Sequence, residues 1–173
     1  MKAKPTTVAQ VPTGTLPGES AERASDPAQP RGCSHFKLRQ LSRRVGRFYD
    51  GALADETGLK TSQYSLLSHV QWLQPVRPAD LAAQMELTPS TLTRNLQPLL
   101  AQGWLAIGPG TDGRSRLITL TPEGQAKRLQ AQQVWKRAQR AFNARLGPER
   151  VQALHALIDD CMAVLAQDTD GLT

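Results

Sequence analysis

Hydrophobic residues recur at intervals of three or four from about residue 34 onward, which is the spacing of one helix face. The pattern predicts a long first helix that runs to about Ala54 and a second helix over residues 61–73, with a break at Gly58 between them. Residues 74–78 contain two prolines and are expected to form a loop. The predicted inner positions are Leu38, Leu41, Val45, Phe48 and Leu53 in the first helix, and Tyr64, Leu67, Val70 and Trp72 or Leu73 in the second.

The middle of the chain predicts two helices joined by a tight link. A short helix begins at Pro78, and after the link Thr88 and Pro89 suit the cap and the first position of the next helix. Pro98 falls inside this second helix, but the apolar stripe continues beyond it, so the helix is expected to persist until Gly103. The predicted inner positions are Leu81, Ala82 and Met85 in the first of these helices, and Leu92, Leu96, Leu99 and Leu100 in the second.

A hairpin is predicted directly after these helices. Its strands are expected at residues 104–107 and 115–120, and residues 108–114, rich in glycine, form the tip. Helix, tight link, second helix and hairpin follow one another as in a winged helix-turn-helix. The predicted fold class is therefore mostly α (α+β), with a winged helix-turn-helix over residues 61–121 and N- and C-terminal dimerisation helices.

Two more helices are predicted after the hairpin. The first begins with a helix-start signature: Thr121 is the cap, Pro122 takes the first helical position, and Glu123 is an acid in the first turn. Gly147-Pro148 separates the two helices. Their apolar faces exceed what one small core can cover, so we expect a symmetric dimer built on residues 33–60 and 122–168. The predicted inner positions are Ala126, Leu129, Val134, Ala138, Phe142 and Leu146, then Val151, Leu154, Ile158, Cys161 and Leu165.

Composition narrows the class of protein. Residues 1–32 are rich in proline and small polar residues and are expected to be a disordered tail. The net charge of +6 suits a polyanionic partner. The chain shows neither a membrane-length apolar run nor a signal peptide, so no membrane partner and a cytoplasmic location are expected. Cys33 and Cys161 have no zinc-finger spacing and are expected to be free thiols, with Cys161 in the core.

Polar side chains gather at the start of the second middle helix, the end at which a recognition helix contacts base edges in the major groove. Their hydroxyl, guanidinium and amide groups can bind bases and phosphates. Thr91 has a simpler alternative role, because it can serve only in the helix cap. The candidate DNA-binding residues on this helix are Ser90, Thr91, Thr93, Arg94 and Asn95.

These motifs resemble the MarR family of bacterial regulators over about residues 34–168. The matching segments are residues 89–96 with Leu99 and Leu100, residues 103–105, residues 112–116 and residues 117–124. The resemblance implies a homodimer that binds a palindromic operator on double-stranded DNA through that helix and leaves it on binding a small ligand or an oxidant. It also places Arg114 and Arg116 at the minor groove or its phosphates, with Asp112 orienting the wing arginine. The alternative for Arg116 is a solvated strand residue.

The resemblance further implies an effector site between the dimer helices and the winged unit. The candidates are His35, Arg39 and Tyr49 on the first helix and Tyr64 and His69 on the second. Charged and aromatic side chains together suit a small aromatic carboxylate, such as a benzoate or a hydroxylated pyridine carboxylate. The leading hypothesis is therefore a repressor that such an effector releases from its operator. The alternatives are a solvated Arg39 and a His69 satisfied within its own helix.

Two other functions remain open. The first is a cysteine-based redox sensor that would use Cys33. In peroxide-sensing members of the family, however, the reactive cysteine occupies the position that is His35 here, two residues after Cys33. The second is a winged-helix module that docks on protein without an operator, which Arg94 and the wing arginines disfavour. The three histidines lie on different predicted helices and no catalytic motif is visible, so we expect no metal, no cofactor and no enzyme activity.

Overall fold

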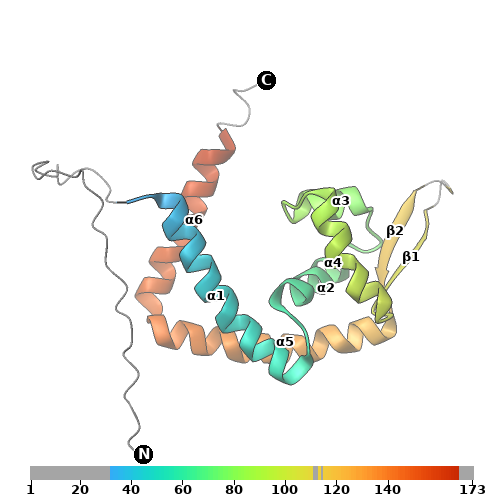
Figure 1. The fold of residues 1–173 in the computed structure, drawn as a ribbon, viewed down its shortest axis with the longest axis horizontal. Coiled ribbons are helices and arrows are strands. Elements are labelled where there is room, and N and C mark those ends of the chain that lie inside the picture. Colours follow the sequence, from blue (N-terminus) through green and yellow to red (C-terminus); the bar gives the residue numbers. More distant parts are fainter. Residues whose placement is uncertain (1–31, 111–112, 114, 168–173) are drawn as a thin grey trace, which may run out of the picture. The chain divides into compact units, whose positions relative to one another are not determined.

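The computed structural model describes residues 32–110, 113 and 115–167. The chain divides after Ser34, and residues 35–173 form the unit considered below. Within this unit the long helix α5 connects the terminal helices α1 and α6 with the winged elements α2, α3, α4, β1 and β2 (Figure 1). The predicted tail before residue 32, the C-terminal residues 168–173, and Asp112 and Arg114 lie outside the described residues.

The described residues contain helices in the predicted order and one two-stranded sheet, so the predicted fold class is confirmed. α2 has the predicted bounds, whereas α1 continues three residues past its predicted end at Ala54. The elements are α1 Ser34–Thr57, α2 Thr61–Leu73, α3 Pro78–Gln84, α4 Pro89–Ala101, β1 Leu105–Pro109, β2 Arg116–Leu120, α5 Pro122–Leu146 and α6 Pro148–Gln167.

Side-chain caps and prolines fix where α4 and α5 begin. The Oγ1 of Thr88 accepts the backbone N–H of Thr91 at 3.3 Å, and the Oγ1 of Thr121 accepts that of Gly124 at 3.0 Å. Each cap is followed by a proline, whose missing N–H costs nothing at the first helical position. As predicted, α4 continues through Pro98.

The link between α3 and α4 reverses the chain sharply. Glu86 has a φ of 51°, a left-handed conformation that residues other than glycine rarely adopt. The N–H of Leu87 donates to the carbonyl of Ala82 at 2.8 Å and closes the turn. This tight turn places α4 against α3 as the second helix of a helix-turn-helix.

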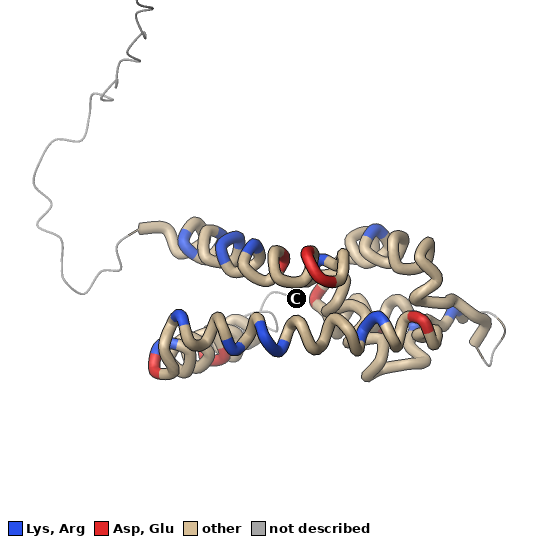
Figure 2. The backbone as a smooth tube through the Cα atoms, turned by 90° about the horizontal axis from the view of Figure 1, so that it is seen from below, with Lys and Arg blue, Asp and Glu red and all other residues tan. Residues whose placement is uncertain are grey.

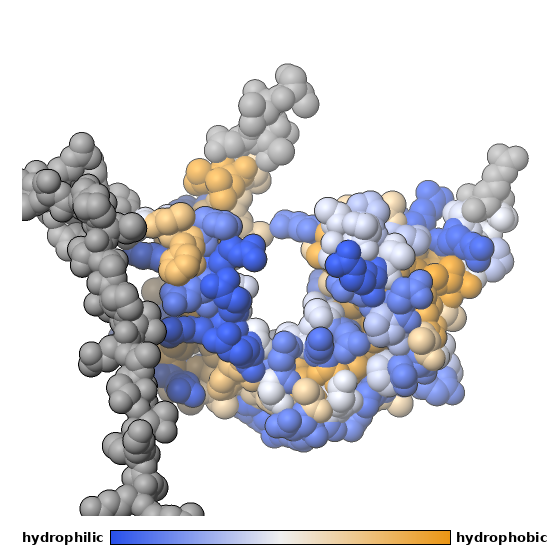
Figure 3. Space-filling view, viewed as in Figure 1, coloured by the Kyte–Doolittle hydropathy of each residue, from blue (hydrophilic) through white to orange (hydrophobic). Residues whose placement is uncertain are grey.

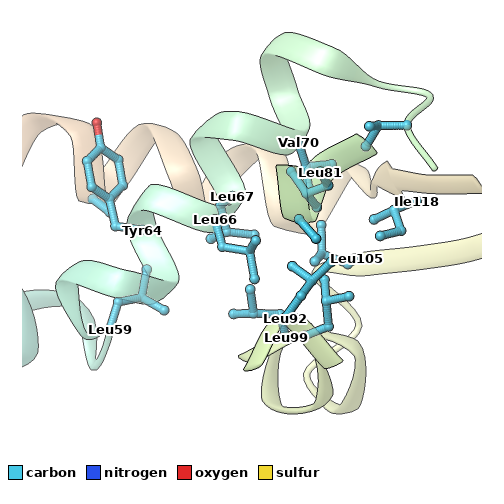
Figure 4. Packing of buried hydrophobic residues seen from close by; sticks show 14 of the residues in the cluster. Leu59, Tyr64, Leu66, Leu67, Val70, Leu81, Leu92, Leu99, Leu105 and Ile118 are labelled. Carbon is cyan, nitrogen blue, oxygen red and sulfur yellow. The ribbon is translucent and has the colours of Figure 1, made fainter. Parts of the chain in front are cut away.

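The hydrophobic core lies where the winged elements meet the first half of α5 (Figure 4). Ala131 and Val134 bring α5 into this core, and Leu53 and Leu59 bring in the end of α1. Burying a leucine or isoleucine side chain contributes roughly 1.5–3 kcal/mol, so the winged elements have a substantial core within one chain. The fully buried residues of the winged elements include Leu66, Leu67, Val70, Leu81, Leu92, Leu99 and Ile118.

The wing sheet is wider than the hairpin predicted from sequence. β1 and β2 pair antiparallel, with Ile107 opposite Ile118, and Ile118 also exchanges two backbone hydrogen bonds with Val76 at 2.8 and 3.1 Å. The predicted loop at residues 74–78 therefore contributes a bridge to the free edge of β2. Gly108 and Pro109, expected in the tip, belong to β1, so the predicted start of the tip was wrong by two residues.

The outer parts of both terminal helices remain exposed in the single chain. Every residue of segments 33–44 and 155–166 is exposed, including several large apolar ones. Figure 3 shows hydrophobic side chains at the outer ends of α1 and α6. None of the described helices combines the length and the apolar character needed to cross a membrane.

Several predicted inner positions are on the surface. Cys161 is exposed, so its assignment to the core was wrong for the single chain. Ala126 and Leu129 are also exposed, because α5 turns residues 131, 134 and 138 inward instead. The alternatives Trp72 and Leu73 are resolved in favour of Leu73, which packs against the core while Trp72 is exposed.

Candidate nucleic-acid interface

α4 has two chemically distinct faces. Leu92, Leu96 and Leu99 are buried in the winged core, whereas Ser90 and Arg94 are exposed on the opposite side. Among the other predicted DNA-binding residues, Thr93 is exposed and Thr91 and Asn95 are half-buried. The leucines therefore hold the helix while its first two turns present polar groups to solvent.

Local hydrogen bonds organise the hydroxyl groups at the start of α4. The Oγ1 of Thr88 lies 3.1 Å from the Oγ of Ser90 and 2.8 Å from the Oγ1 of Thr91. The hydroxyl of Thr93 donates to the carbonyl of Pro89 at 2.9 Å. Thr91 thus takes part in the cap, which was its simpler alternative role.

Arg94 is the only positively charged residue of α4. Among the described residues, no carboxylate lies within 4 Å of its guanidinium group. The positive end of the α4 dipole and the N–H groups of its first turn lie on the same side and favour anions. This end of the helix can therefore bind phosphates as well as base edges.

The wing contributes one described residue of the predicted set. Arg116 begins β2 opposite Pro109, and its side chain is exposed. Gly113 has a φ of 67°, a conformation suited to a glycine in a tight tip. Since Asp112 and Arg114 lie outside the described residues, the predicted contact between them stays a prediction.

A close approach of two backbones fixes the wing to α5. A Cβ added at Gly124 would lie 1.9 Å from the carbonyl oxygen of Trp104, so only glycine fits there. That same oxygen accepts the N–H of Thr121 at 3.2 Å, and the hydroxyl of Thr121 donates to the carbonyl of Gly103 at 2.7 Å. The end of α4, β1 and the start of α5 are therefore held together.

Two of the predicted effector residues pack on one face of α5. The ring of Tyr64 lies 6.1 Å from that of Trp135, and the ring of Tyr49 lies 5.5 Å from that of Phe142. The hydroxyl of Tyr49 also donates to the Oε1 of Gln139 at 2.8 Å. Burial raises the pKa of Tyr49 above its usual value, so it stays a neutral donor near pH 7. We call these aromatic residues of α1, α2 and α5 the aromatic stripe.

The other three predicted effector residues do not join this stripe in the single chain. His35 and Arg39 lie on the exposed outer part of α1. At a rise of about 1.5 Å per residue, Arg39 lies roughly 15 Å from Tyr49 along the helix, more than one benzoate can span. The Nδ1 of His69 lies 2.8 Å from the carbonyl oxygen of Ser65 in its own helix. The five residues do not form one cluster within a single chain.

The sequence reasoning missed a groove between α1, α5 and α6. It has a volume of 790 Å³ and an apolar floor that includes Phe48 and Phe142. We call it the arginine groove, because its other lining residues include Arg44, Arg47, Arg145 and Arg150. Lys and Arg follow one another along α1, as Figure 2 shows. No spacing in the sequence indicates such a site, since its walls come from segments about 100 residues apart.

No group of three or more possible metal ligands occurs among the described histidines, cysteines and acids.

Comparison with known proteins adds to this geometry. Residues 57–115 match the family model described as "MarR family". The uncharacterized HTH-type transcriptional regulator YwoH of Bacillus subtilis (strain 168) is 30% identical over 70 residues, which are 40% of this chain and 51% of YwoH. The match therefore spans about half of that curated relative.

Solved structures share the fold over most of the described chain. The M. tuberculosis transcriptional regulator MosR, crystallised with DNA, is 29% identical with a TM-score of 0.64, over 77% of this chain and 98% of MosR. The apo form of E. coli MarR is 21% identical with a TM-score of 0.63, over 76% of this chain and 98% of MarR. The matched helix-turn-helix and the shared fold together confirm the resemblance seen in the sequence. Residues 57–115 therefore match the MarR family, and the chain has the fold of winged-helix transcriptional regulators of that family.

Proposed function

We propose that this regulator is a homodimeric, sequence-specific repressor that inserts α4 into the major groove of a palindromic operator. The observation that carries the proposal is the division of α4 into a buried leucine face and an exposed polar face with Arg94 near its start. Arg116 and Arg114 of the hairpin would reach the minor groove or its phosphates, with Asp112 orienting Arg114. The DNA-bound state of MosR supports a DNA partner for this fold.

The dimer in this proposal is built on α1 and α6. Every residue of their outer parts is exposed in one chain, although these parts carry large apolar residues such as Phe36, Leu157 and Met162. Exposed apolar patches of this kind mark protein interfaces. A two-fold dimer would present two α4 helices to half-sites about 34–36 Å apart, or a multiple of that distance.

A small aromatic carboxylate is proposed to release the dimer from DNA. The aromatic stripe lies where α1 and α2 pack on the helix that leads to the winged core, so a ligand there could change the distance between the two α4 helices. His35 and Arg39 of the second protomer would supply positive charge to the carboxylate of the ligand. His69 would form a hydrogen bond with the ligand. Such a ligand acts only if it binds the free protein and the DNA-bound protein with different affinities. To lower the affinity for DNA tenfold, its binding free energies for the two shapes must differ by about 1.4 kcal/mol.

Fluorescence anisotropy with labelled duplex DNA at several salt concentrations tests the DNA-binding part. We expect a steep fall of affinity with salt, because phosphate contacts release counterions. A protein that binds no duplex at low salt would instead be a winged-helix module for protein partners.

Gel shifts with benzoates and pyridine carboxylates under reducing conditions test the effector. Wild-type protein should leave DNA at lower ligand concentrations than Arg39→Ala. If peroxide alone released the wild type from DNA, and the Cys33→Ser variant were not released, the carboxylate hypothesis would be wrong. The protein would then be a redox sensor that acts through the Cys33 thiol.

A further inference from the structure

The arginine groove combines an apolar floor with a strongly cationic rim. Of the residues that the structure describes, four arginines from α1, α5 and α6 line it, and no aspartate or glutamate does. Among the described residues, no carboxylate lies within 4 Å of any of the four guanidinium groups. Covering this rim with an apolar surface alone would leave like charges desolvated and unpaired, which is costly. The surface that covers the groove should therefore carry both apolar side chains and negative charge.

The outer half of α6 has this combination. At 3.6 residues per turn, Leu157, Ile158 and Met162 fall on one face of the helix, and each is exposed in the single chain. Asp159 and Asp160 fall on the two sides of that face and are the only acidic residues between positions 150 and 167. An apolar face with one carboxylate at each edge matches an apolar floor with arginines on both walls.

The groove cannot receive this part of α6 from its own chain. Arg150 and Leu154, on the inner half of the same helix, already form one wall of the groove. Residues 155–166 extend beyond that wall and are exposed along their whole length. Among the described residues, neither Asp159 nor Asp160 forms an ion pair within the chain.

We propose that the outer half of α6 from a second copy of this chain seats in the arginine groove, with Asp159 and Asp160 paired to its arginines. The inference rests on the proposed homodimer and names the contacts that select the partner and its register. Because a dimer is two-fold symmetric, each protomer gives one α6 and receives one, so the pairing occurs twice. Opposite charges at defined positions also disfavour wrong partners and shifted registers.

A charge-swap experiment on the full chain tests this pairing. One variant carries Asp159→Lys and Asp160→Lys, and the other carries Arg44→Glu and Arg145→Glu. Analytical ultracentrifugation should show at least tenfold weaker homodimers for each variant, because each places like charges opposite one another. Mixing them should restore dimers, as heterodimers that native mass spectrometry identifies, because each charge again faces its opposite.

The control variant Asp55→Lys/Asp80→Lys makes the same number of acid-to-base changes away from the groove and should dimerise like wild type. All substituted side chains are exposed in the single chain, and circular dichroism would verify that each variant folds. A dimeric wild type whose affinity neither swap changes would overturn the pairing and leave the homodimer standing. Weakened homodimers that fail to form heterodimers on mixing would also overturn it. If the wild-type protein were a monomer, the result would contradict the proposed homodimer itself.

Discussion

The winged elements and the outer terminal helices use the same apolar residue types with opposite results. Leu99 of α4 is 0% exposed, whereas Leu157 of α6 is 61% exposed, although each lies on an apolar face of its helix. The leucines of the winged elements are surrounded by two strands and five helices of one chain, since α5 and the end of α1 join the core. The outer parts of α1 and α6 have no comparable cover among the described residues. The difference indicates that one region folds on its own contacts, and it supports our proposal that a second chain completes the other.

α5 connects the two regions and couples them. Ala131 and Val134 lie in the winged core, while Phe142 and Leu146 line the arginine groove at the other end of the same helix. Gly124 fixes the start of α5 against the backbone of the wing. In the proposed dimer, a change in how the terminal helices pair would therefore be transmitted along α5 to α4.

The largest effect should separate the two leucines directly. Leu99→Ala leaves a cavity in the core and should lower the free energy of unfolding by about 2–5 kcal/mol. Leu157→Ala, the matched control, should change it only within about 0.5 kcal/mol in the monomer, and more at concentrations that favour the dimer. Urea unfolding at several protein concentrations measures both. Equal losses for the two variants at high dilution would contradict the division into two regions.

Two glycines in helices provide the next contrast. Gly124→Ala forces a methyl group against the Trp104 carbonyl and should destabilise the protein by about 1–3 kcal/mol or more. Gly51→Ala in α1 meets nothing within 4 Å and should stabilise it by roughly 0.5–1 kcal/mol. Thermal unfolding of the two variants gives the comparison. A stable Gly124→Ala protein would mean that the wing and α5 are not in close contact.

Arg94→Ala tests the exposed face of α4. A base-edge contact would contribute about 1–3 kcal/mol of discrimination, so affinity for the operator should fall more than affinity for random DNA. Gln102→Ala, at the far end of the same helix, is the control and should bind like wild type. Anisotropy titrations against both duplexes measure the ratio. An unchanged ratio would remove Arg94 from base recognition.

Arg116→Ala should give the smallest effect. An arginine at the minor groove or its phosphates acts mainly through charge, so affinity should fall by similar factors on all sequences. The slope of log affinity against log salt should become shallower by about one. If the slope and the affinity both stayed the same, Arg116 would be the solvated strand residue that was its alternative.

Local chemistry made most of the fold predictable from the sequence. Thr88-Pro89 and Thr121-Pro122 mark helix starts because their caps and prolines act within one turn, and both starts were confirmed. The spacing of apolar residues was less informative for α5 and α6, in which some apolar positions pack in the core and others are exposed in the single chain. It assigned Leu129 and Cys161 to the inside, although the single chain leaves both exposed.

Features built from distant segments could not be predicted. The bridge from Val76 to Ile118 depends on how the loop after α2 meets β2. The arginine groove depends on the angles among α1, α5 and α6, which periodicity does not specify. For the same reason, residues of suitable chemistry such as Arg39 and Tyr49 were grouped into one effector site, although one chain does not bring them together.

In vitro selection of binding sites from a random duplex library, with the full-length protein, tests the central claim most directly. A dimer completed through its terminal helices presents two α4 helices related by a two-fold axis. We predict that the selected sequences will be inverted repeats with half-site centres about one helical turn, or a multiple of it, apart. Isolated half-sites, direct repeats or no enrichment would contradict the account.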